Sequence, residues 1–480
     1  MTAVRNDERD LGRVFRALGV VLSIIGALVF VFGRTSRIAR TSFPFDFNLN
    51  WIGARRLIRG EDIYDSASAS TQAVALLGRE MVTTNPSPFV RFIGPPSTAL
   101  LHVPFLGVDH DTAVTTFRVL TVLLIVASVF VTARLLPKEA QLGGCLLSLG
   151  ALLVSFPLAN TIALGQGNGF VMISLALGVW GATRERWAVA GIGLGLATVL
   201  KISPVLLVVY LVLRGRRLPA YWAASTAIAV SCVAAIAGRP IELWIWLRDV
   251  APDVGRGSLQ VFNQSVVGWV ARLTAGTDAD LADQSVLGRH WGIAANLVAA
   301  VLLVILWRKR RNFELIPLEL GAVIVIALLV GPLSWEHYLV WAFIPFTLCF
   351  DPTLWTHRTR RATAAVAACL AIGTYLLTIP LQIVWLDSRG TEWAPWVTSP
   401  GTLAALLFFV AMWQLLTPTG ASRHPGGEAS PTEVPRTTAT PPGAMWCRAS
   451  VAKPGAPRMS RWKTATTKTP VTSMSTSAAA

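Results

Sequence analysis

Apolar residues in this chain fall in long blocks, and no other feature of the sequence restricts its fold as strongly. The first block runs from Val14 to Gly33, and about 20 apolar residues are enough for a helix to cross the hydrocarbon core of a bilayer. The blocks are apolar throughout and are not amphipathic stripes. Only 14% of the residues are charged, whereas soluble domains carry about 25%. We therefore predict an all-α polytopic membrane protein.

Basic residues occupy the short segments between the apolar blocks, and they orient the chain. Four arginines precede or begin the first block, and later clusters lie at Arg214–Arg217, Arg308–Arg311 and Arg358–Arg361. Because short cytoplasmic loops collect Lys and Arg, this distribution explains the net charge of +16 without nucleic acid as a partner. It predicts a multi-pass protein of the cell membrane with both termini in the cytoplasm.

The same pattern divides the chain into three parts. Residues 1–13 form a cytoplasmic N-terminus, and residues 14–416 form a transmembrane domain. Residues 417–480 form a basic cytoplasmic tail, rich in Pro, Ser, Thr, Ala and Gly, that we expect to be disordered. We expect about ten to thirteen passes and two long extracytoplasmic loops, at about 34–95 and 239–290.

Some segments of the membrane domain have irregular features. Proline removes a helix hydrogen bond, so the span Trp187–Leu213 should break near Lys201–Pro204. We also predict spans at Ser334–Phe350 and Ala362–Pro380. An amphipathic stretch at Phe47–Ile58 is expected to lie in the membrane interface with its apolar face in lipid.

Asp46 stands at the head of the first outer loop, beside Phe43, Phe45 and Phe47. A carboxylate that is partly desolvated tends to have a raised pKa. Such a group suits a general base that takes a proton from an acceptor hydroxyl. The alternative is an ordinary solvated aspartate of a loop.

Ionisable residues near span ends supply further candidates, because such groups must find partners or water. Glu336 and His337 lie at the outer mouth of a late span, where they either serve a substrate or form a structural pair. Lys201 lies within an apolar run. Its ammonium either meets a lipid phosphate or extends to the interface.

Amide side chains and one arginine complete the candidate set. Gln166 and Asn168 lie in a polar break between spans, where they either bind a sugar or a diphosphate or cap a tight turn. Asn263 and Gln264 are interpreted as polar lining of the second outer loop, and Arg55 in the first loop is a further candidate for binding phosphate.

The sequence has no cluster with metal-ligand spacing, no Ser/His/Asp order and no nucleotide-binding fingerprint. We therefore expect neither a metal nor a cofactor. An enzyme with this sequence needs a substrate that arrives already activated and is delivered by the membrane.

The polar motifs, taken in order, resemble those of glycosyltransferase family 87. Its members are polyprenyl-phosphate-sugar-dependent transferases of the actinobacterial cell envelope and have the GT-C fold. The resemblance covers residues 40–350 and leaves out the tail. The matching pieces are Asp46-Phe47 with Trp51, Ala54-Arg55 and Gly60-Glu61-Asp62-Ile63-Tyr64-Asp65, then Gly94-Pro95-Pro96, Gly165-Gln166-Gly167-Asn168, Gly191 and Gly195 with Lys201-Ile202-Ser203-Pro204, Asn263-Gln264-Ser265, and Ser334-Trp335-Glu336-His337. Gly94 stands where the family usually has an aromatic residue.

The resemblance implies a GT-C-type transmembrane helical bundle that performs an inverting, metal-independent transfer. The implied donor is a β-linked polyprenyl-phosphate sugar, most commonly mannose. The implied acceptor is a lipid-anchored glycan on the extracytoplasmic face, in the synthesis of phosphatidylinositol mannosides, lipomannan or lipoarabinomannan. Asp46 matches the catalytic aspartate, and His337 matches a histidine near the donor phosphate. Asn48 stands where many GT-C enzymes have a second acid, which agrees with metal independence.

Two alternatives remain at this level. Some members of the family transfer arabinofuranose from polyprenyl phosphate instead of mannose. A lipid or solute transporter is the alternative of another class, and inverted repeats with paired broken helices are typical of it. The sequence has one predicted broken span and no visible repeat. The sugar, the linkage, the acceptor and the oligomeric state are not determined by the sequence.

Overall fold

The computed structural model describes residues 2–33, 43–77, 92–258, 260–275, 284–308, 315–356, 358–388 and 390–417. The predicted disordered tail, apart from Thr417, lies outside the described residues. Parts of both predicted outer loops, residues 34–42, 78–91 and 276–283, lie outside them as well. The helices described below all belong to one compact unit, residues 1–423.

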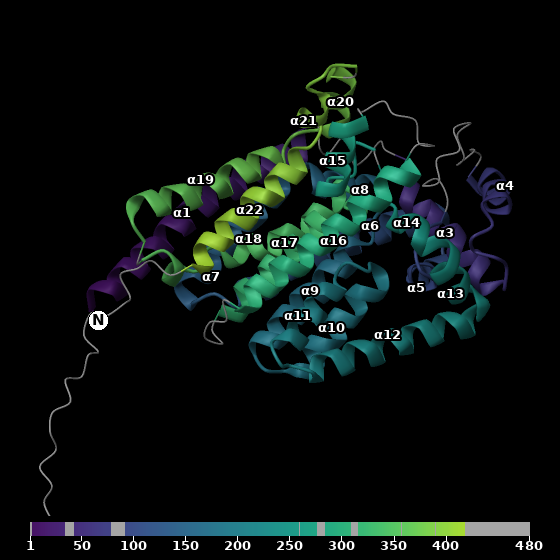
Figure 1. The fold of residues 1–480 in the computed structure, drawn as a ribbon, viewed down its shortest axis with the longest axis horizontal. Coiled ribbons are helices and arrows are strands. Elements are labelled where there is room, and N and C mark those ends of the chain that lie inside the picture. The colour runs from purple at the N-terminus through teal and green to yellow at the C-terminus, as the bar shows by residue number, and fades with distance from the viewer. Residues whose placement is uncertain are drawn as a thin grey trace, which may run out of the picture. The chain divides into compact units, whose positions relative to one another are not determined.

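Helices are the regular secondary structure of the described residues, which otherwise contain turns, connecting segments and one isolated β-bridge between Asn263 and Trp335 (Figure 1). The first half of the chain forms α1 (Thr2–Phe32), α3 (Phe45–Ile58), α4 (Ser66–Leu77), α5 (Pro96–Leu100), η1 (Val103–Gly107), α6 (His110–Ala133), α7 (Lys138–Val154), α8 (Phe156–Leu164), α9 (Asn168–Thr183), α10 (Trp187–Leu200), α11 (Val205–Leu213) and α12 (Leu218–Ala237).

The second half continues the same pattern of long helices joined by short ones. It forms α13 (Ile241–Ile245), η2 (Trp246–Val250), α14 (Ala251–Gly255), α15 (Val266–Ala275), α16 (Gln284–Arg308), α17 (Ile316–Val330), η5 (Glu336–Ala342), α18 (Phe343–Leu348), η6 (Pro352–Leu354), α19 (Arg360–Leu376), α20 (Leu381–Ser388), α21 (Ala394–Val397) and α22 (Pro400–Leu416).

The lengths and composition of these helices agree with a membrane protein. Within the described residues, three helices are long and apolar enough to cross a membrane: α1 over Asp7–Phe32, α6 and α12. The α7–α8 pair, bent by 63°, makes a fourth span if it is taken as one. Shorter apolar helices include α9, α10, α17 and α22. The all-α prediction is confirmed for the described residues, while the number of passes stays a prediction.

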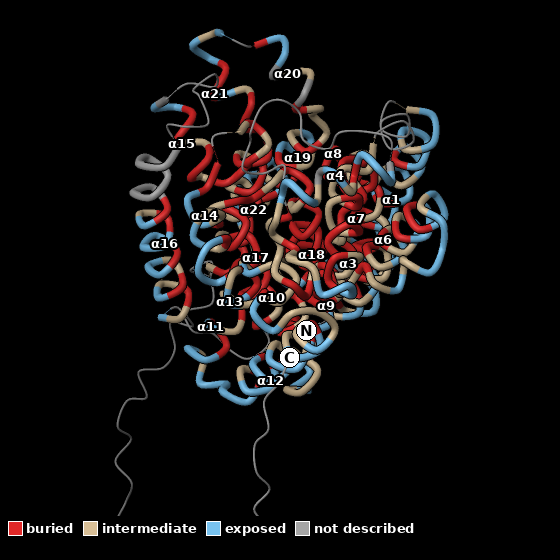
Figure 2. The backbone as a smooth tube through the Cα atoms, turned by 90° about the vertical axis from the view of Figure 1, so that its right-hand side faces the viewer, coloured by how far each residue is buried: buried red, intermediate tan, exposed pale blue. Residues whose placement is uncertain are grey.

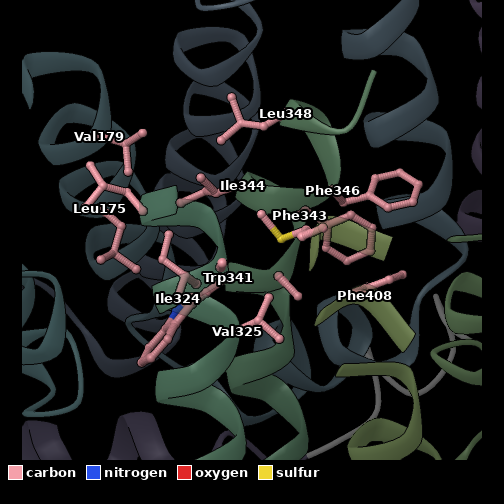
Figure 3. Packing of buried hydrophobic residues seen from close by; sticks show 14 of the residues in the cluster. Leu175, Val179, Ile324, Val325, Trp341, Phe343, Ile344, Phe346, Leu348 and Phe408 are labelled. Carbon is pink, nitrogen blue, oxygen red and sulfur yellow. The ribbon is translucent and has the colours of Figure 1, made fainter. Parts of the chain in front are cut away.

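Helix α17 forms the centre of the bundle. Its residues are buried from Ile316 to Val330, apart from the half-buried Pro317, and it packs against α9, α16, α18 and α22. Figure 3 shows side chains of α9, α17, η5, α18 and α22 packed together, with Trp341 and Phe343 among them. Figure 2 shows the contrast with α12 and α16, whose outward sides are exposed. An apolar outward side is what a helix that faces lipid requires.

Glycines allow the outer helices to approach one another closely. A Cβ on Gly193 would lie 2.6 Å from the Ser174 carbonyl oxygen of α9, and one on Gly195 would lie 2.7 Å from the Ala223 oxygen of α12. Gly191 likewise faces the Pro219 backbone of α12. These three glycines of α10 thus permit close helix packing, because helices can only approach this closely where side chains are absent.

Three local expectations have different outcomes. The predicted break of the span Trp187–Leu213 is confirmed, since α10 ends at Leu200 and α11 begins at Val205. The stretch Ser334–Phe350 is not one continuous helix, because it contains the 3₁₀ helix η5 followed by the short α18. The Phe47–Ile58 stretch is helical, but protein buries its apolar side: Phe47 packs against Phe117.

Candidate active site

Segments that are far apart in the chain meet around one cavity of about 360 Å³. Its walls come from the start of α3, the α5–η1 segment, the α8–α9 turn, the α10–α11 break, parts of residues 246–262, and residues 331–338. We call it the central cavity. Most of its lining is apolar, and its polar groups include Asp46, Gln166, Lys201 and His337. Four of the residues singled out from the sequence are therefore brought together.

Asp46 lies in the first turn of α3, where the sequence Phe43-Pro44-Phe45 leads into the helix. The Gln166 side chain donates a hydrogen bond to its carboxylate. Burial raises the pKa of the Asp46 carboxyl above its ordinary value, while that hydrogen bond and the attraction of the Lys201 ammonium act in the opposite direction. A desolvated carboxylate with a raised pKa is a stronger proton acceptor than a solvated one.

The turn before α9 brings Gln166 to Asp46. Gly165 ends α8 in the left-handed conformation, with φ of 67°, which glycine adopts without strain. A Cβ at Gly165 would lie 2.6 Å from the Cβ of Phe47. The glycine thus permits both the turn and the close approach of α3, and the neighbouring residues Gln166 and Asp46 can then meet.

Lys201 lies in the α10–α11 break and points to a tyrosine. Its Nζ donates a hydrogen bond of 2.6 Å to the Tyr338 hydroxyl and lies 4.2 Å from the centre of the Tyr338 ring. The hydroxyl oxygen accepts this bond, which leaves its own proton available to a further acceptor. Both side chains line the central cavity, so together they offer two kinds of hydrogen-bond donor to an anion.

His337 is held in place by its backbone. The Thr161 hydroxyl and the Asn168 amide both donate to the His337 carbonyl oxygen, at 3.2 and 3.0 Å. The imidazole packs edge-on against the Tyr338 ring, with centroids 4.9 Å apart. Its Nε2 has no hydrogen-bond partner among the described residues. A positioned ring nitrogen of this kind is suited to contact a substrate.

Glu336 lies behind the cavity wall. It is buried and is not a lining residue, and its carboxylate accepts a hydrogen bond from the Asn160 amide. Asn160 itself lines the cavity. The Asn160 amide nitrogen is the donor in this contact, which fixes the orientation of the Asn160 side chain. Glu336 therefore orients a polar lining group, and Asn168 does the same for the His337 backbone.

Asn263 and Gln264 also lie outside the lining, and their amides are engaged with the backbone. Asn263 Nδ2 donates to the Ser258 and Pro332 carbonyls, and its Oδ1 accepts from the Ser334 amide. Gln264 Nε2 donates to Thr398, and its Oε1 accepts from the amide at the start of α22. Both amides thus tie the 331–338 segment and α22 to the second predicted loop, and direct substrate binding by them stays a prediction.

Arg55 lies on the side of α3 that faces away from Asp46. Its guanidinium stacks over the Trp51 ring, 4.8 Å from the centroid, and it is not a lining residue of the central cavity. Its predicted contact with a phosphate is not tested by this arrangement and stays a prediction.

Several polar lining residues had not been singled out from the sequence, among them Asn160, Tyr338 and His102. Tyr338 directly follows the Glu336-His337 pair, and that neighbourhood was the available signal. His102 Nδ1 donates a hydrogen bond to the Thr98 carbonyl oxygen, 2.9 Å away, and the ring stacks on Phe117. In an apolar run, a single histidine or asparagine gives no sign of which cavity it will face.

The described residues contain no group of three or more His, Cys, Asp or Glu side chains that could hold a metal ion. The chemistry available at the central cavity is that of a carboxylate base, an ammonium with an adjacent phenol, and an imidazole. Such a set can remove a proton from a hydroxyl at one place and stabilise a negative leaving group at another.

Comparison with known proteins gives a consistent result. The sequence model of glycosyltransferase family 87 matches residues 92–332. A Mycobacterium tuberculosis protein named polyprenol-phosphate-mannose-dependent alpha-(1-2)-phosphatidylinositol mannoside mannosyltransferase is 27% identical over 432 residues, which is 82% of this chain and 92% of that protein.

Two further relatives have related names. The Mycolicibacterium smegmatis protein of the same name is 27% identical over 365 residues, which is 70% of this chain and 76% of that protein. A second M. tuberculosis protein, named as the corresponding pentamannoside mannosyltransferase, is 28% identical over 294 residues, which is 58% of this chain and 63% of that protein.

Proposed function

The chain belongs to glycosyltransferase family 87, and we propose that it transfers mannose from a polyprenyl-phosphate donor to a lipid-anchored glycan. The acceptor class we propose is a phosphatidylinositol mannoside or a related lipoglycan, because the relatives named above act on such acceptors. The observation that supports this function at residue level is the meeting of Asp46, Lys201 and His337 around one cavity, from three distant parts of the chain.

Asp46 is the general base of the proposed reaction. It takes the proton of an acceptor hydroxyl, and the hydroxyl oxygen forms a bond to the anomeric carbon of the mannose. The bond between that carbon and the phosphate oxygen breaks at the same time, and its electron pair leaves with the polyprenyl phosphate. One displacement of this kind inverts the anomeric centre, whereas retention requires a second nucleophile. A β-linked donor then gives an α-linked product, the linkage that the relatives' names contain.

Lys201, Tyr338 and His337 form the phosphate end of the proposed site. The phosphate of the donor has one negative charge as a diester and gains charge as it leaves. A charge-assisted hydrogen bond from Lys201 is available before and during transfer, so Lys201 contributes mainly to donor binding. A group that bonds more strongly to the leaving phosphate than to the diester contributes to turnover, and His337 is our candidate for it.

The proposed arrangement in the membrane follows from the basic loops. Arg214–Arg217 lies at the far end of α11 from Lys201, so the positive-inside rule puts the central cavity on the extracytoplasmic side. Single cysteines in a cysteine-free background test this with an impermeant thiol reagent. Thr71→Cys on α4 should react in intact cells, and Arg216→Cys should react only after permeabilisation. The reverse pattern would exclude the proposed topology.

The direct test of the function uses membranes that contain the protein and labelled polyprenyl-phosphate-mannose or polyprenyl-phosphate-arabinose. We expect transfer of mannose to a glycolipid acceptor in the absence of added metal and in the presence of a chelator. Transfer of arabinose alone would replace mannose by arabinofuranose as the substrate. The relatives' names favour mannose, and membership of the family argues against the transporter alternative.

A further inference from the structure

The wall of the central cavity reaches the outside of the helical bundle at one residue. The α10–α11 break contributes Leu200, Lys201, Ile202 and Ser203 to the lining. Among the described lining residues, Ile202 alone is exposed, with 47% of its surface accessible, and the others are buried or half-buried. The cavity therefore adjoins the side of the bundle at Ile202, next to the cation of Lys201.

An apolar strip continues from Ile202 along α11. Val205, Val209 and Val212 are exposed by 37%, 42% and 41%, and spacings of four and three place them on one side of the helix. The polar side chain of α11, Tyr210, points inward, where its hydroxyl lies 2.5 Å from Glu319. We call Ile202, Val205, Val209 and Val212 the α11 strip.

The strip and the cavity together have the polarity of an amphiphile. Lys201 presents its ammonium inside the cavity beside Tyr338, while the very next residue begins an aliphatic surface. Helix α11 has nine residues, so the strip extends for about 14 Å at 1.5 Å per residue. It leads away from the cavity to Arg214, the end that the basic loop places near the opposite membrane face.

We propose that the α11 strip binds the isoprenoid chain of the donor next to its phosphate, while the phosphate lies at Lys201 and the sugar lies in the cavity. This assignment rests on the proposed function. An apolar chain in a bilayer gains little from leaving lipid, because lipid tails are as apolar as valine, so the contact works through packing. The branched methyl groups of valine and isoleucine offer a ridged surface to a chain that is itself methyl-branched.

The proposal predicts that donor recognition depends on chain length and that α11 sets this dependence. The probes are mannosyl phosphate esters of a long polyprenol and of geraniol. The wild type should have a lower KM for the long-chain ester. In the double variant Val209→Trp/Val212→Trp, two indole rings occupy the distal strip. The KM for the long-chain ester should rise about tenfold, the lower end of the discrimination that apolar pockets provide, while the geranyl ester, too short to reach these positions, is used as before.

A matched control separates this effect from a general disturbance of the bundle. Ile228 on α12 is 64% exposed and does not line the cavity. Ile228→Trp should leave the KM for both esters unchanged. An equal KM of the wild type for the two esters, or an equal rise for both esters in the double variant, would overturn the assignment. If the wild type transferred mannose from neither ester, the proposed function itself would fail.

Photo-crosslinking gives a second readout that does not depend on turnover. A photoreactive amino acid is introduced in place of Val209 or Ile228, and the membranes are irradiated with the long-chain ester labelled in its polyprenyl chain. The label should attach to the protein at position 209 and not at position 228, and unlabelled long-chain ester should compete. Equal labelling at both positions, or no labelling at 209, would exclude the strip as the binding surface.

Discussion

Substitution of Asp46 by asparagine separates base strength from shape. The amide has the size of the carboxyl group, and the Gln166 side chain can still pair with it after rotation of its own amide. The fold should therefore persist, while the proton acceptor is lost. General-base catalysis contributes about 10²–10⁴-fold, so we expect kcat to fall by at least about 10²-fold, which corresponds to roughly 2.7 kcal/mol of transition-state stabilisation.

If Asp46 is the base, the direction in which activity changes with pH can also be predicted. A protonated carboxyl cannot take the acceptor proton, so activity falls as the pH falls through the pKa of Asp46. Because burial raises that pKa above the ordinary value, the acidic limb of kcat/KM should begin at a higher pH than for a solvated aspartate. The residual activity of Asp46→Asn should lack this limb.

The assay measures transfer of labelled mannose from the polyprenyl-phosphate donor in membranes with equal amounts of each variant. Asp249→Asn serves as the control, because Asp249 is an exposed carboxylate of the second predicted loop that pairs with Arg248. It should retain near-wild-type activity. Near-normal transfer by Asp46→Asn at equal expression, or an unchanged acidic limb, would refute the assignment of the base.

Three further substitutions test the surroundings of Asp46. Lys201→Met should raise the KM for the donor much more than it lowers kcat, because a charge contact is present before and during transfer; steady-state kinetics with varied donor checks this. Asn168→Ala removes the hydrogen bonds to the Thr161 hydroxyl and to the His337 carbonyl, each of which contributes about 1 kcal/mol to stability. The variant should therefore have a lower midpoint of thermal unfolding in detergent and also a lower kcat. An unchanged midpoint would contradict the contribution of these bonds. Gly165→Ala forces a side chain into left-handed backbone beside Phe47, which should lower the free energy of unfolding by about 1–2 kcal/mol or more. It should reduce both the yield of folded protein and the activity. The control is Gly215→Ala, at a glycine with positive φ but open space around it, which should reduce only stability.

Local backbone features were the easiest to predict from the sequence. Proline disrupts a helix anywhere after the first turn, so a break before Pro204 followed from the residue itself. By contrast, hydropathy predicted a continuous span at Ser334–Phe350, because apolarity does not report backbone geometry. There the His337 carbonyl is bonded by side chains from α8 and α9, which no local pattern reveals.

In the candidate site, too, some features could be predicted from the sequence and others could not. Asp46, Gln166, Lys201 and His337 could be named as polar groups in apolar surroundings, and they line one cavity. The tertiary structure decides which hydrogen-bond partner each polar group has. The pairing of Lys201 with Tyr338 was therefore not predictable. For the same reason, amphipathicity in α3 did not tell whether lipid or protein would cover its apolar side.

The packing of α1 against α7 has a consequence for biogenesis. Gly19 and Gly26 of α1 face Gly143 and Gly150 of α7 at backbone distance, and Ser23 donates to the Leu146 carbonyl. At about 5–20 residues per second, the ribosome needs roughly ten seconds to complete α7 after α1. During that interval α1 is in the membrane or the insertion machinery without the surface that its glycines fit. The earliest helix of this enzyme therefore completes its packing only after α6 and α7 have been synthesised, and its insertion must rely on its own apolarity.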